Sequence, residues 1–329
     1  MKSFFASRVA PASPWSAPSA AEEYGRTATP DWREVDWAAH LHRSEIDGTE
    51  VNYVDIGSGE GRPVVLVHGL GGQWQNWLEN IPRLSRERRV VALDLPGFGL
   101  SPEPRERITI SGYGRCVNAL CEQLGLGSMH LVGNSMGGFV AAEATIQSPA
   151  RVERLVLVSA AGISSTNVYR APALLVGRGA KVLTARTAAR HERMARRPRT
   201  RYGALIFVAR YPHKLRADLA YEGFIKGAGK PGFEAAFRAS LEYDFRDRLP
   251  EIRCPTLIFW GEQDSILPVK DAQEFERLIP DSRKVVMRET GHVPMAERPD
   301  AFNRELREFL AETGPAEERE PVQGESQAA

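Results

Sequence analysis

Five short apolar runs constrain the fold of this chain more than any other feature. They read PVVLVHG (63–69), RVVALDLPG (89–97), MHLVGNS (129–135), VERLVLVSA (152–160) and CPTLIFWGEQD (254–264). Because they do not alternate between apolar and polar residues, they predict strands that are buried on both faces. Helical patterns separate the runs. The chain is therefore expected to form an α/β fold, with a mostly parallel sheet and helices on both faces.

Changes in pattern along the chain predict its organisation. Residues 44–57 alternate around Asp47-Gly48 and predict a hairpin. The strand–helix rhythm stops near Gly162 and resumes at Cys254. We expect a flexible leader and lead-in over residues 1–40, a core over 41–163 and 248–314, a helical insertion over 164–247 and a disordered tail over 315–329. Within the lead-in, the sequence DWREVDWAAHL suggests a short amphipathic helix. The apolar patch Phe4–Ala6 is too short for a secretory signal.

Charge and cysteine content narrow the classes of function. The whole chain carries a formal net charge of +1, which predicts no nucleic-acid partner. The stretch from Ser164 to Lys230 nevertheless contains fifteen Lys and Arg residues and only three acidic residues. Solvated helix faces are our preferred interpretation of this charge, and weak contact with an anionic membrane surface is the alternative. The odd number of cysteines, Cys116, Cys121 and Cys254, predicts reduced thiols in a cytoplasmic protein.

The run at 129–135 leads directly into Gly133-Asn134-Ser135-Met136-Gly137 and then into an Ala-rich helical pattern. A serine that presents its hydroxyl from the end of a strand needs a sharp turn. Such a turn brings the positions two before and two after the serine close to neighbouring backbone, which explains Gly133 and Gly137. The helix that follows would point its N–H groups at the same spot. Ser135 is therefore a candidate nucleophile, with an ordinary glycine-rich turn as the alternative.

Two further residues follow predicted strands at their carboxyl ends, where α/β proteins place their sites. Asp264 comes after the run ending in Trp260-Gly261, and we prefer it to the nearby acids Glu262 and Asp271. His292 follows Gly291 after the last predicted strand. Each residue on its own has a simpler structural interpretation. The order serine, aspartate, histidine along the chain is what favours a shared site.

This order, together with VLVHGLGG, DLPGFGLS, GNSMGG, GEQDSILP and TGHVPMAERP, resembles the α/β-hydrolase superfamily from about Ile46 to Glu312. The resemblance implies an eight-stranded type of sheet and a cap formed by the insertion. It also implies that Ser135 attacks an acyl carbon, that His292 is the general base and that Asp264 orients the imidazole. The N–H groups of Met136 and Leu70 would bind the oxyanion. His68 would brace its loop, and no metal or cofactor would be required.

The substrate is less constrained by the sequence than the chemistry. Apolar clusters in the insertion, at 174–176 and 205–208, suit a carboxylic ester with an apolar acyl chain, such as a monoacylglycerol. They would equally suit packing of the insertion against the core. The same triad also serves C–C bond hydrolases of ring meta-cleavage. Those enzymes usually carry Gly-Pro-Gly in the His-Gly loop and a Trp after the histidine, whereas this chain has HGLGGQW and Val293. A ligand-binding receptor on the same fold is a third alternative.

Overall fold

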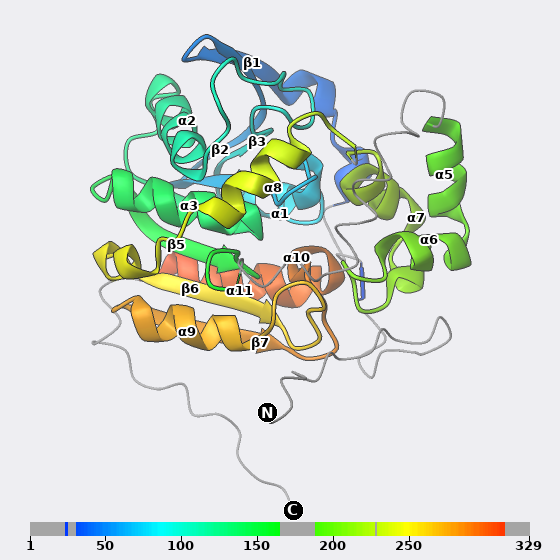
Figure 1. Cartoon of the computed structure of the whole chain (residues 1–329). Helices are drawn as coiled ribbons and strands as arrows, with labels where there is room; N and C mark the ends of the chain where they lie inside the picture. Colours follow the sequence, from blue (N-terminus) through cyan, green and yellow to red (C-terminus); the bar gives the residue numbers. More distant parts are fainter. Residues whose placement is uncertain (1–23, 26–30, 165–187, 228, 313–329) are drawn as a thin grey trace, which may run out of the picture.

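A seven-stranded sheet forms the centre of the computed structural model, which describes residues 24–25, 31–164, 188–227 and 229–312 (Figure 1). The strands are β1 (Leu41–Ile46), β2 (Thr49–Val67), β3 (Arg88–Leu93), β4 (Met129–Asn134), β5 (Val152–Val158), β6 (Thr256–Gly261) and β7 (Ser282–Met287). Their order is β1-β2-β4-β5-β6-β7, with β3 paired to β2. β1 and β2 pair antiparallel, whereas β2 with β4, β4 with β5, β5 with β6 and β6 with β7 pair parallel. The predicted mostly parallel α/β sheet is therefore confirmed.

The strand count differs from the eight-stranded type of sheet because β2 is one continuous strand of 19 residues. Its first part pairs Tyr53 with Leu93 and Ile56 with Val90, while its second part pairs Val64 with Val90. The chain therefore reverses within β2, so that one strand lies along both sides of β3. Two predicted strands are joined in this way. The reversal is tight at Gly57, where an added Cβ would lie 2.5 Å from the carbonyl oxygen of Arg88.

The described residues before and within the first hairpin form turns and two strands. The predicted hairpin is present, with Asp47 and Gly48 at positive φ between β1 and β2. Before it, two 3-10 turns, η1 (Trp32–Glu34) and η2 (Trp37–His40), replace the suggested amphipathic helix. Asp31 and Asp36 each cap one turn, and extended Val35 separates them. Two separate caps therefore divide the segment into two short turns.

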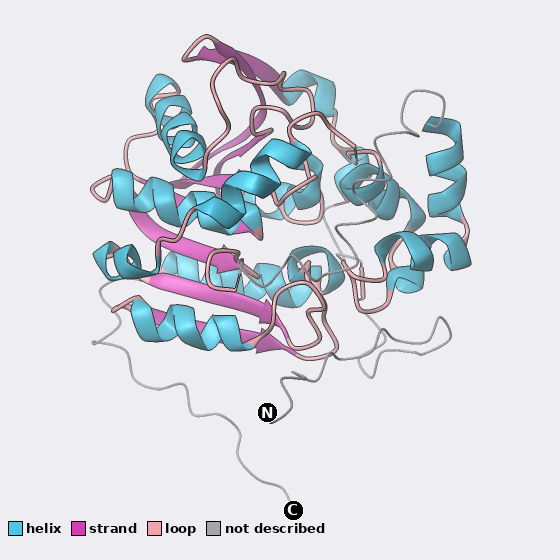
Figure 2. Cartoon of the chain, in the orientation of Figure 1, coloured by secondary structure: helices cyan, strands magenta, loops and turns pink. Residues whose placement is uncertain are grey.

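Helices cover both faces of the sheet (Figure 2). Within β2, Val65 and Val67 belong to one buried cluster, while Val64 and Leu66 belong to the other. Each such apolar side chain contributes roughly 1.5–3 kcal/mol when fully buried. The first cluster is covered by α2 (Ile110–Gln123), α3 (Met136–Gln147) and α9 (Lys270–Leu278). The second is covered by η3 (Trp74–Trp77), α1 (Ile81–Leu84), α10 (Pro294–Glu297) and α11 (Pro299–Ala311).

Helices also fill the described part of the chain between β5 and β6. We call residues 188–227 and 229–245 the cap segment. It contains α5 (Ala188–Arg196), α6 (Pro198–Leu205), η5 (Pro212–Lys214), α7 (Ala217–Leu219), the π-helix η6 (Ala220–Ile225) and α8 (Phe233–Glu242), and η7 (Arg246–Glu251) follows it. Leu205, Leu215 and Leu219 join the second buried cluster, whereas Ala236 joins the first. The apolar residues 174–176, most of the leader and the tail from 315 lie outside the described residues.

The cysteines have the character expected of reduced thiols. Cys116 and Cys121 both lie in α2, and all three cysteines are free. Burial raises the pKa of each thiol to about 12, which keeps the thiols protonated and unreactive near neutral pH. Within the described ranges, no helix is both long and apolar enough to cross a bilayer.

A buried carboxylate connects the chain that returns from the cap segment to two core helices. Glu143 in α3 accepts hydrogen bonds from Ser111 in α2 and from the hydroxyl of Tyr243, at 3.0 and 2.8 Å. Arg248 in η7 forms an ion pair with the same carboxylate at 3.1 Å. The Glu143 side chain is only 2% exposed, so its charge depends on these partners.

Removal of this carboxylate should destabilise the fold. We expect Glu143→Ala to lower the free energy of unfolding by about 2–3 kcal/mol, because it leaves several partly buried donors without an acceptor. Urea unfolding monitored by circular dichroism measures the change. Glu122→Ala is the matched control, since Glu122 is 71% exposed and pairs with Arg151 at 3.2 Å. The control should change stability by less than about 1 kcal/mol, and equal losses in the two variants would contradict the role of Glu143.

Candidate active site

Ser135 lies at a strained turn between β4 and α3. Its backbone has φ 57° and ψ −120°, a conformation that side-chain-bearing residues rarely adopt. Such strain costs about 1–3 kcal/mol and persists only where the surroundings impose it. Here the Ser135 N–H donates to the carbonyl of Val158, and its own carbonyl accepts from Gly138 and Ala161. The turn is therefore held from the neighbouring strand and from its own helix.

The glycines on either side of Ser135 are required by the packing of the backbone. A Cβ added to Gly133 would lie 2.1 Å from the carbonyl oxygen of Gly137. A Cβ added to Gly137 would lie 2.3 Å from the carbonyl oxygen of Val67 in β2. Neither backbone neighbour can move aside without a change to the sheet. The elbow is thus packed as closely as the sequence spacing predicts.

A loop from the end of β2 runs beside the serine. A Cβ added to Gly69 would lie 3.0 Å from the Cβ of Ser135, so the two residues are in contact. Leu70 follows directly and is half-buried against the first cluster. Met136 is the first residue of α3, where a backbone N–H has no acceptor within the helix. Leu70 and Met136 are the two residues expected to bind an oxyanion. Each therefore directly follows one member of the contacting pair, Gly69 and Ser135.

His68 supports this loop by two hydrogen bonds. Its Nε2 accepts from the N–H of Leu95 at 3.0 Å, so the proton must be on Nδ1, which donates to the carbonyl of Gly69 at 2.7 Å. Burial lowers the pKa of His68, which favours this neutral form. Both ring nitrogens are occupied, in keeping with a bracing role.

Asp264 and His292 form a buried pair. The Oδ2 atom of Asp264 lies 2.7 Å from Nδ1 of His292, and the two side chains are 0% and 6% exposed. The other oxygen of Asp264 accepts from the N–H groups of Ile266 and Leu267, at 2.8 and 2.9 Å. With the carboxylate ionised, Nδ1 carries the proton, which leaves Nε2 free to act as a base. This orientation is the one that general-base catalysis requires.

Asn134 joins the elbow to the histidine loop. Its side-chain amide donates to the carbonyl of Val158 at 3.1 Å and to that of His292 at 3.3 Å. Its Oδ1 lies 3.2 Å from the position that a Cβ on Gly69 would take. The elbow, the Gly69 loop and the histidine loop therefore meet at the carboxyl edge of the sheet.

The two rival acids lie elsewhere. Asp271 is buried, but its carboxylate accepts from the N–H and hydroxyl of Ser164. Glu262 is exposed and accepts from the side chain of Gln263. The described contacts thus pair only Asp264 with His292. In the part of the chain that the structure describes, no group of His, Cys, Asp and Glu side chains is arranged to hold a metal ion.

Sequence reasoning missed two buried acids that support the site. Asp94 accepts from the N–H groups of Trp74 and Leu100, at 2.8 and 2.9 Å. Glu297 accepts from the N–H groups of Gly291 and Val293, which flank His292. Asp94 begins the DLPGFG stretch, and Glu297 lies in VPMAERP. In the sequence, the signal that could have identified these two acids is their position beside a glycine-rich or proline-rich loop.

The cap segment is bonded to the same loops. Gln73 and Asn76, which follow the Gly69 loop, donate to the carbonyls of Glu222 and Gly223 in η6, at 2.8 and 2.5 Å. A Cβ on Gly71 would lie 3.2 Å from the ring of Phe233, so this ring packs against the loop. The cap segment therefore reaches the site from the side of the Gly69 loop.

Comparison with known proteins agrees with this arrangement. Residues 62–299 match the family model described as alpha/beta hydrolase fold. A 2-hydroxy-6-oxo-2,4-heptadienoate hydrolase of Pseudomonas putida is 32% identical, over 80% of this chain and 94% of its own. A dihydrolipoyllysine-residue acetyltransferase component of an acetoin cleaving system, from the same species, is 30% identical over 82% of this chain and 68% of its own.

One solved structure is similar to this chain over most of the length of both proteins. The crystal structure of a membrane phospholipase A, described as a bacterial virulence factor, is 29% identical, with a TM-score of 0.61. The match covers 82% of this chain and 85% of that one. The names of these relatives describe different reactions, so the shared feature is the scaffold and its strand-end loops. From the family match over most of its length and the fold described above, this chain belongs to the alpha/beta hydrolase fold family.

Proposed function

We propose that this protein is a serine hydrolase that cleaves carboxylic esters through an acyl-enzyme on Ser135. The observation that carries the proposal is the meeting of three loops at one sheet edge. The strained Ser135 elbow touches Gly69, and Asn134 connects the elbow to the loop of the buried Asp264–His292 pair. Strain and buried polar pairs persist at such a point when they serve a reaction.

In the proposed reaction, Nε2 of His292 takes the proton of the Ser135 hydroxyl as the oxygen attacks the ester carbonyl. The N–H groups of Met136 and Leu70 stabilise the oxyanion, each worth about 2.7–4 kcal/mol of barrier. His292 then gives its proton to the leaving alcohol. Water, deprotonated by His292, attacks the acyl-enzyme and releases the acid, and His292 returns the proton to the oxygen of Ser135 as the acyl bond breaks. Asp264 stabilises the imidazolium throughout.

We propose that the acyl group is apolar, as in a monoacylglycerol-like ester. Phe233 packs on the Gly69 loop, and Val208 is half-buried where its carbonyl accepts from the N–H of His292 at 2.9 Å. Two residues of the cap segment with apolar side chains thus contact the Gly69 loop and the histidine loop, Phe233 through its ring and Val208 through its backbone. The name of the phospholipase relative, which is 29% identical, supports a lipid-like ester.

The alternative is hydrolysis of a C–C bond in a ring meta-cleavage product. The 32% identity to a 2-hydroxy-6-oxo-2,4-heptadienoate hydrolase favours it. Leu70 and Val293 stand where such enzymes usually have residues of a Gly-Pro-Gly loop and a Trp, which is why we prefer the ester. Turnover of 2-hydroxy-6-oxo-2,4-heptadienoate, without turnover of any ester, would overturn this preference.

The nucleophile and the acyl preference can be tested together. On p-nitrophenyl esters of rising chain length, kcat/KM should increase toward medium or long acyl chains. Ser135→Ala should lose at least about a thousandfold in kcat and should no longer label with a fluorophosphonate probe. Ser85→Ala is the control, because the hydroxyl of Ser85 only contacts the carbonyl of Pro82. Labelling of Ser135→Ala equal to that of the wild type would refute the proposal.

The choice of acid can be tested by two matched substitutions. Asp264→Asn should lower kcat by about 10³–10⁴-fold, since an amide at this position favours the wrong imidazole tautomer. Asp271→Asn removes the charge of the neighbouring buried acid, which contacts Ser164 and not His292. Its kcat should change by less than about fivefold. Steady-state kinetics on one ester decides the matter, and a larger loss in Asp271→Asn would reverse the assignment.

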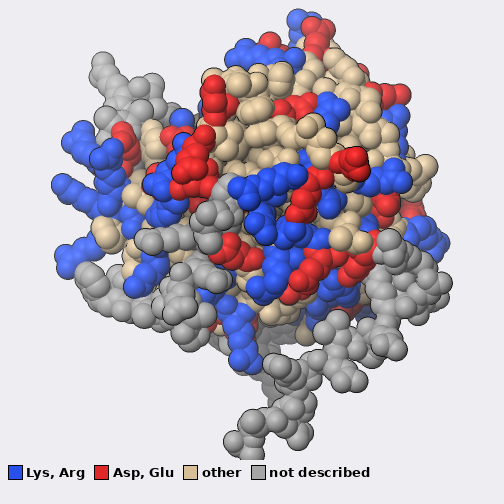
Figure 3. Space-filling model, turned by 180° about the vertical axis from the view of Figure 1, so that it is seen from behind, with Lys and Arg blue, Asp and Glu red and all other residues tan. Residues whose placement is uncertain are grey.

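We also propose that the protein is cytoplasmic, with weak contact between its cap segment and anionic membrane surfaces as the alternative to purely solvated helix faces. Arg193 and Arg196 on α5, Arg199 on α6 and Arg197 between the two helices are exposed, and basic side chains gather on that side of the molecule (Figure 3). Each basic residue near an anionic surface contributes about 1 kcal/mol. The three free cysteines support a cytoplasmic location, because the cytoplasm keeps thiols reduced.

Co-sedimentation with vesicles tests this contact. Binding to vesicles that contain phosphatidylserine should fall when salt is raised from about 0.05 to 0.5 M, because screening shortens the range of the attraction. Arg193→Gln combined with Arg197→Gln should weaken binding. Arg238→Gln is the control, because Arg238 lies on α8 and is partnered by Glu234. Binding that is insensitive to both salt and charge removal would contradict the proposal.

A further inference from the structure

A single buried carboxylate holds the backbone on both sides of His292. Glu297, at the end of α10, accepts from the N–H of Gly291 at 2.9 Å and from that of Val293 at 3.2 Å. It also accepts from the N–H of Arg210, in the cap segment, at 2.7 Å. The Glu297 side chain is inaccessible to solvent. The position of His292 therefore depends on whether the two oxygens of Glu297 keep their donors in place.

The remaining donor to Glu297 comes from the far N-terminal end of the described chain. The hydroxyl of Tyr24 donates to Oε2 of Glu297 at 2.5 Å and accepts from the N–H of Tyr211 at 2.8 Å. Since a hydroxyl has one proton, these two bonds fix its orientation. The next residue, Gly25, donates its N–H to the carbonyl of Glu297 at 2.8 Å. Tyr24 is 4% exposed, so the hydroxyl has no competition from solvent.

The ring of Tyr24 is fixed as firmly as its hydroxyl. The guanidinium of Arg298 lies 5.1 Å from the ring centroid, and the ring of Tyr211 packs edge-on at 5.5 Å. A Cβ added to Gly25 would meet the backbone of Leu215 at 3.1 Å, so this short segment lies directly against the cap segment. Tyr24 is thus in contact with the histidine loop and the cap segment at once.

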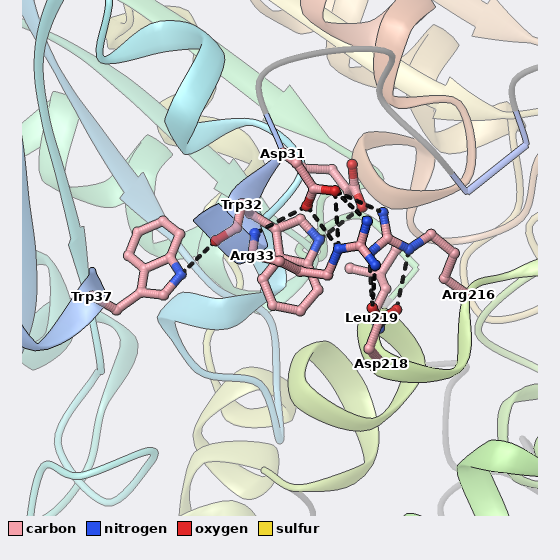
Figure 4. Close-up of polar contacts among 8 residues, drawn as sticks. Asp31, Trp32, Arg33, Trp37, Arg216, Asp218 and Leu219 are labelled. Carbon is pink, nitrogen blue, oxygen red and sulfur yellow. Dashed lines mark hydrogen bonds and ion pairs between the residues drawn. The ribbon is translucent and has the colours of Figure 1, made fainter. Parts of the chain in front are cut away.

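A second group of contacts joins the N-terminal segment to the cap segment (Figure 4). Asp31 and Arg33 lie beside Arg216 and Asp218 of the cap segment, with Arg33–Asp218 and Arg216–Asp31 separations of 3.8 Å. The ring of Trp32 lies under the guanidinium of Arg216 at 5.7 Å, and its Nε1–H donates to Glu79 in the core. The N-terminal segment therefore contacts the cap segment in two places along residues 210–218.

We propose that Tyr24 is a positioning residue for His292 and acts through Glu297. The inference rests on the proposed function, because it assigns His292 the role of base. Without the hydroxyl, Oε2 loses a donor in a buried site, where burial already raises the pKa of Glu297. A carboxyl group that takes up a proton is a weaker acceptor for the three N–H groups, and one of its oxygens must then donate a hydrogen bond of its own. The backbone around His292 would then loosen, and the imidazole would lose its fixed position beside Asp264.

Tyr24→Phe tests this link because it keeps the ring and removes only the hydroxyl. We expect kcat on the best ester to fall roughly tenfold, since small displacements of a reacting group are costly, while KM changes less than about twofold. Glu297→Gln should give a similar loss. The double variant should lose no more than the worse single variant, because the two residues act in series. Tyr53→Phe is the control, because Tyr53 is also buried, at 5% exposure, and its hydroxyl lies 3.2 Å from that of Ser44 in the β1–β2 hairpin.

A second measurement needs no substrate. The Nδ1 proton of His292 should give a downfield proton resonance, identified by its loss in Asp264→Asn, and this signal should shift or broaden in Tyr24→Phe but not in Tyr53→Phe. An unchanged resonance and unchanged kcat in Tyr24→Phe would overturn the inference. Absence of ester turnover by the wild type would count against the proposed function alone, since the resonance still reports on His292. If Tyr24→Phe does not fold, Glu297→Gln must show both effects, and its failure to do so is equally decisive.

Discussion

The close packing of backbone around Ser135 is the constraint on which the site depends. Gly133 and Gly137 lie so close to neighbouring carbonyls that no other residue fits without displacing β2 or α3. This packing places the start of α3 directly over the sheet and imposes a positive φ on Ser135. The free energy that sustains the strain comes from the buried apolar clusters on both faces of the sheet. The rigidity of the sheet and the strained conformation of Ser135 are therefore two aspects of one arrangement.

Much of this arrangement follows from local sequence. Buried parallel strands appear as continuous apolar runs, the Asp47-Gly48 turn specifies a hairpin, and a serine between two glycines at a strand end specifies an elbow. The pairing of Asp264 with His292 is also accessible, because residues that follow parallel strands meet at one edge of the sheet. For these features, the local pattern and the final packing require the same residue types.

Other features depend on contacts between distant residues, which no local pattern records. The reversal within β2 follows from the way Gly57 approaches β3, so eight expected strands become seven. Asp31 and Asp36 give two short turns in place of one helix, because each caps its own turn. Tyr24 lies in a stretch that reads as a leader, yet its hydroxyl meets a carboxylate 273 residues away. Asn134 and Glu297 support His292 through backbone atoms, and residue type alone does not reveal such a role.

The position of the cap segment has a consequence for how such a protein can diversify. The strands β5 and β6 are paired directly, although roughly a hundred residues separate them, and the entropy of closing such a loop rises by only about 0.6 kcal/mol for each doubling of its length. The connection between them can thus lengthen, shorten or be replaced at little thermodynamic cost to the sheet. Changes in the length or sequence of this connection can therefore alter what lies over the carboxyl edge of the sheet, while the pairing of β5 with β6 is kept.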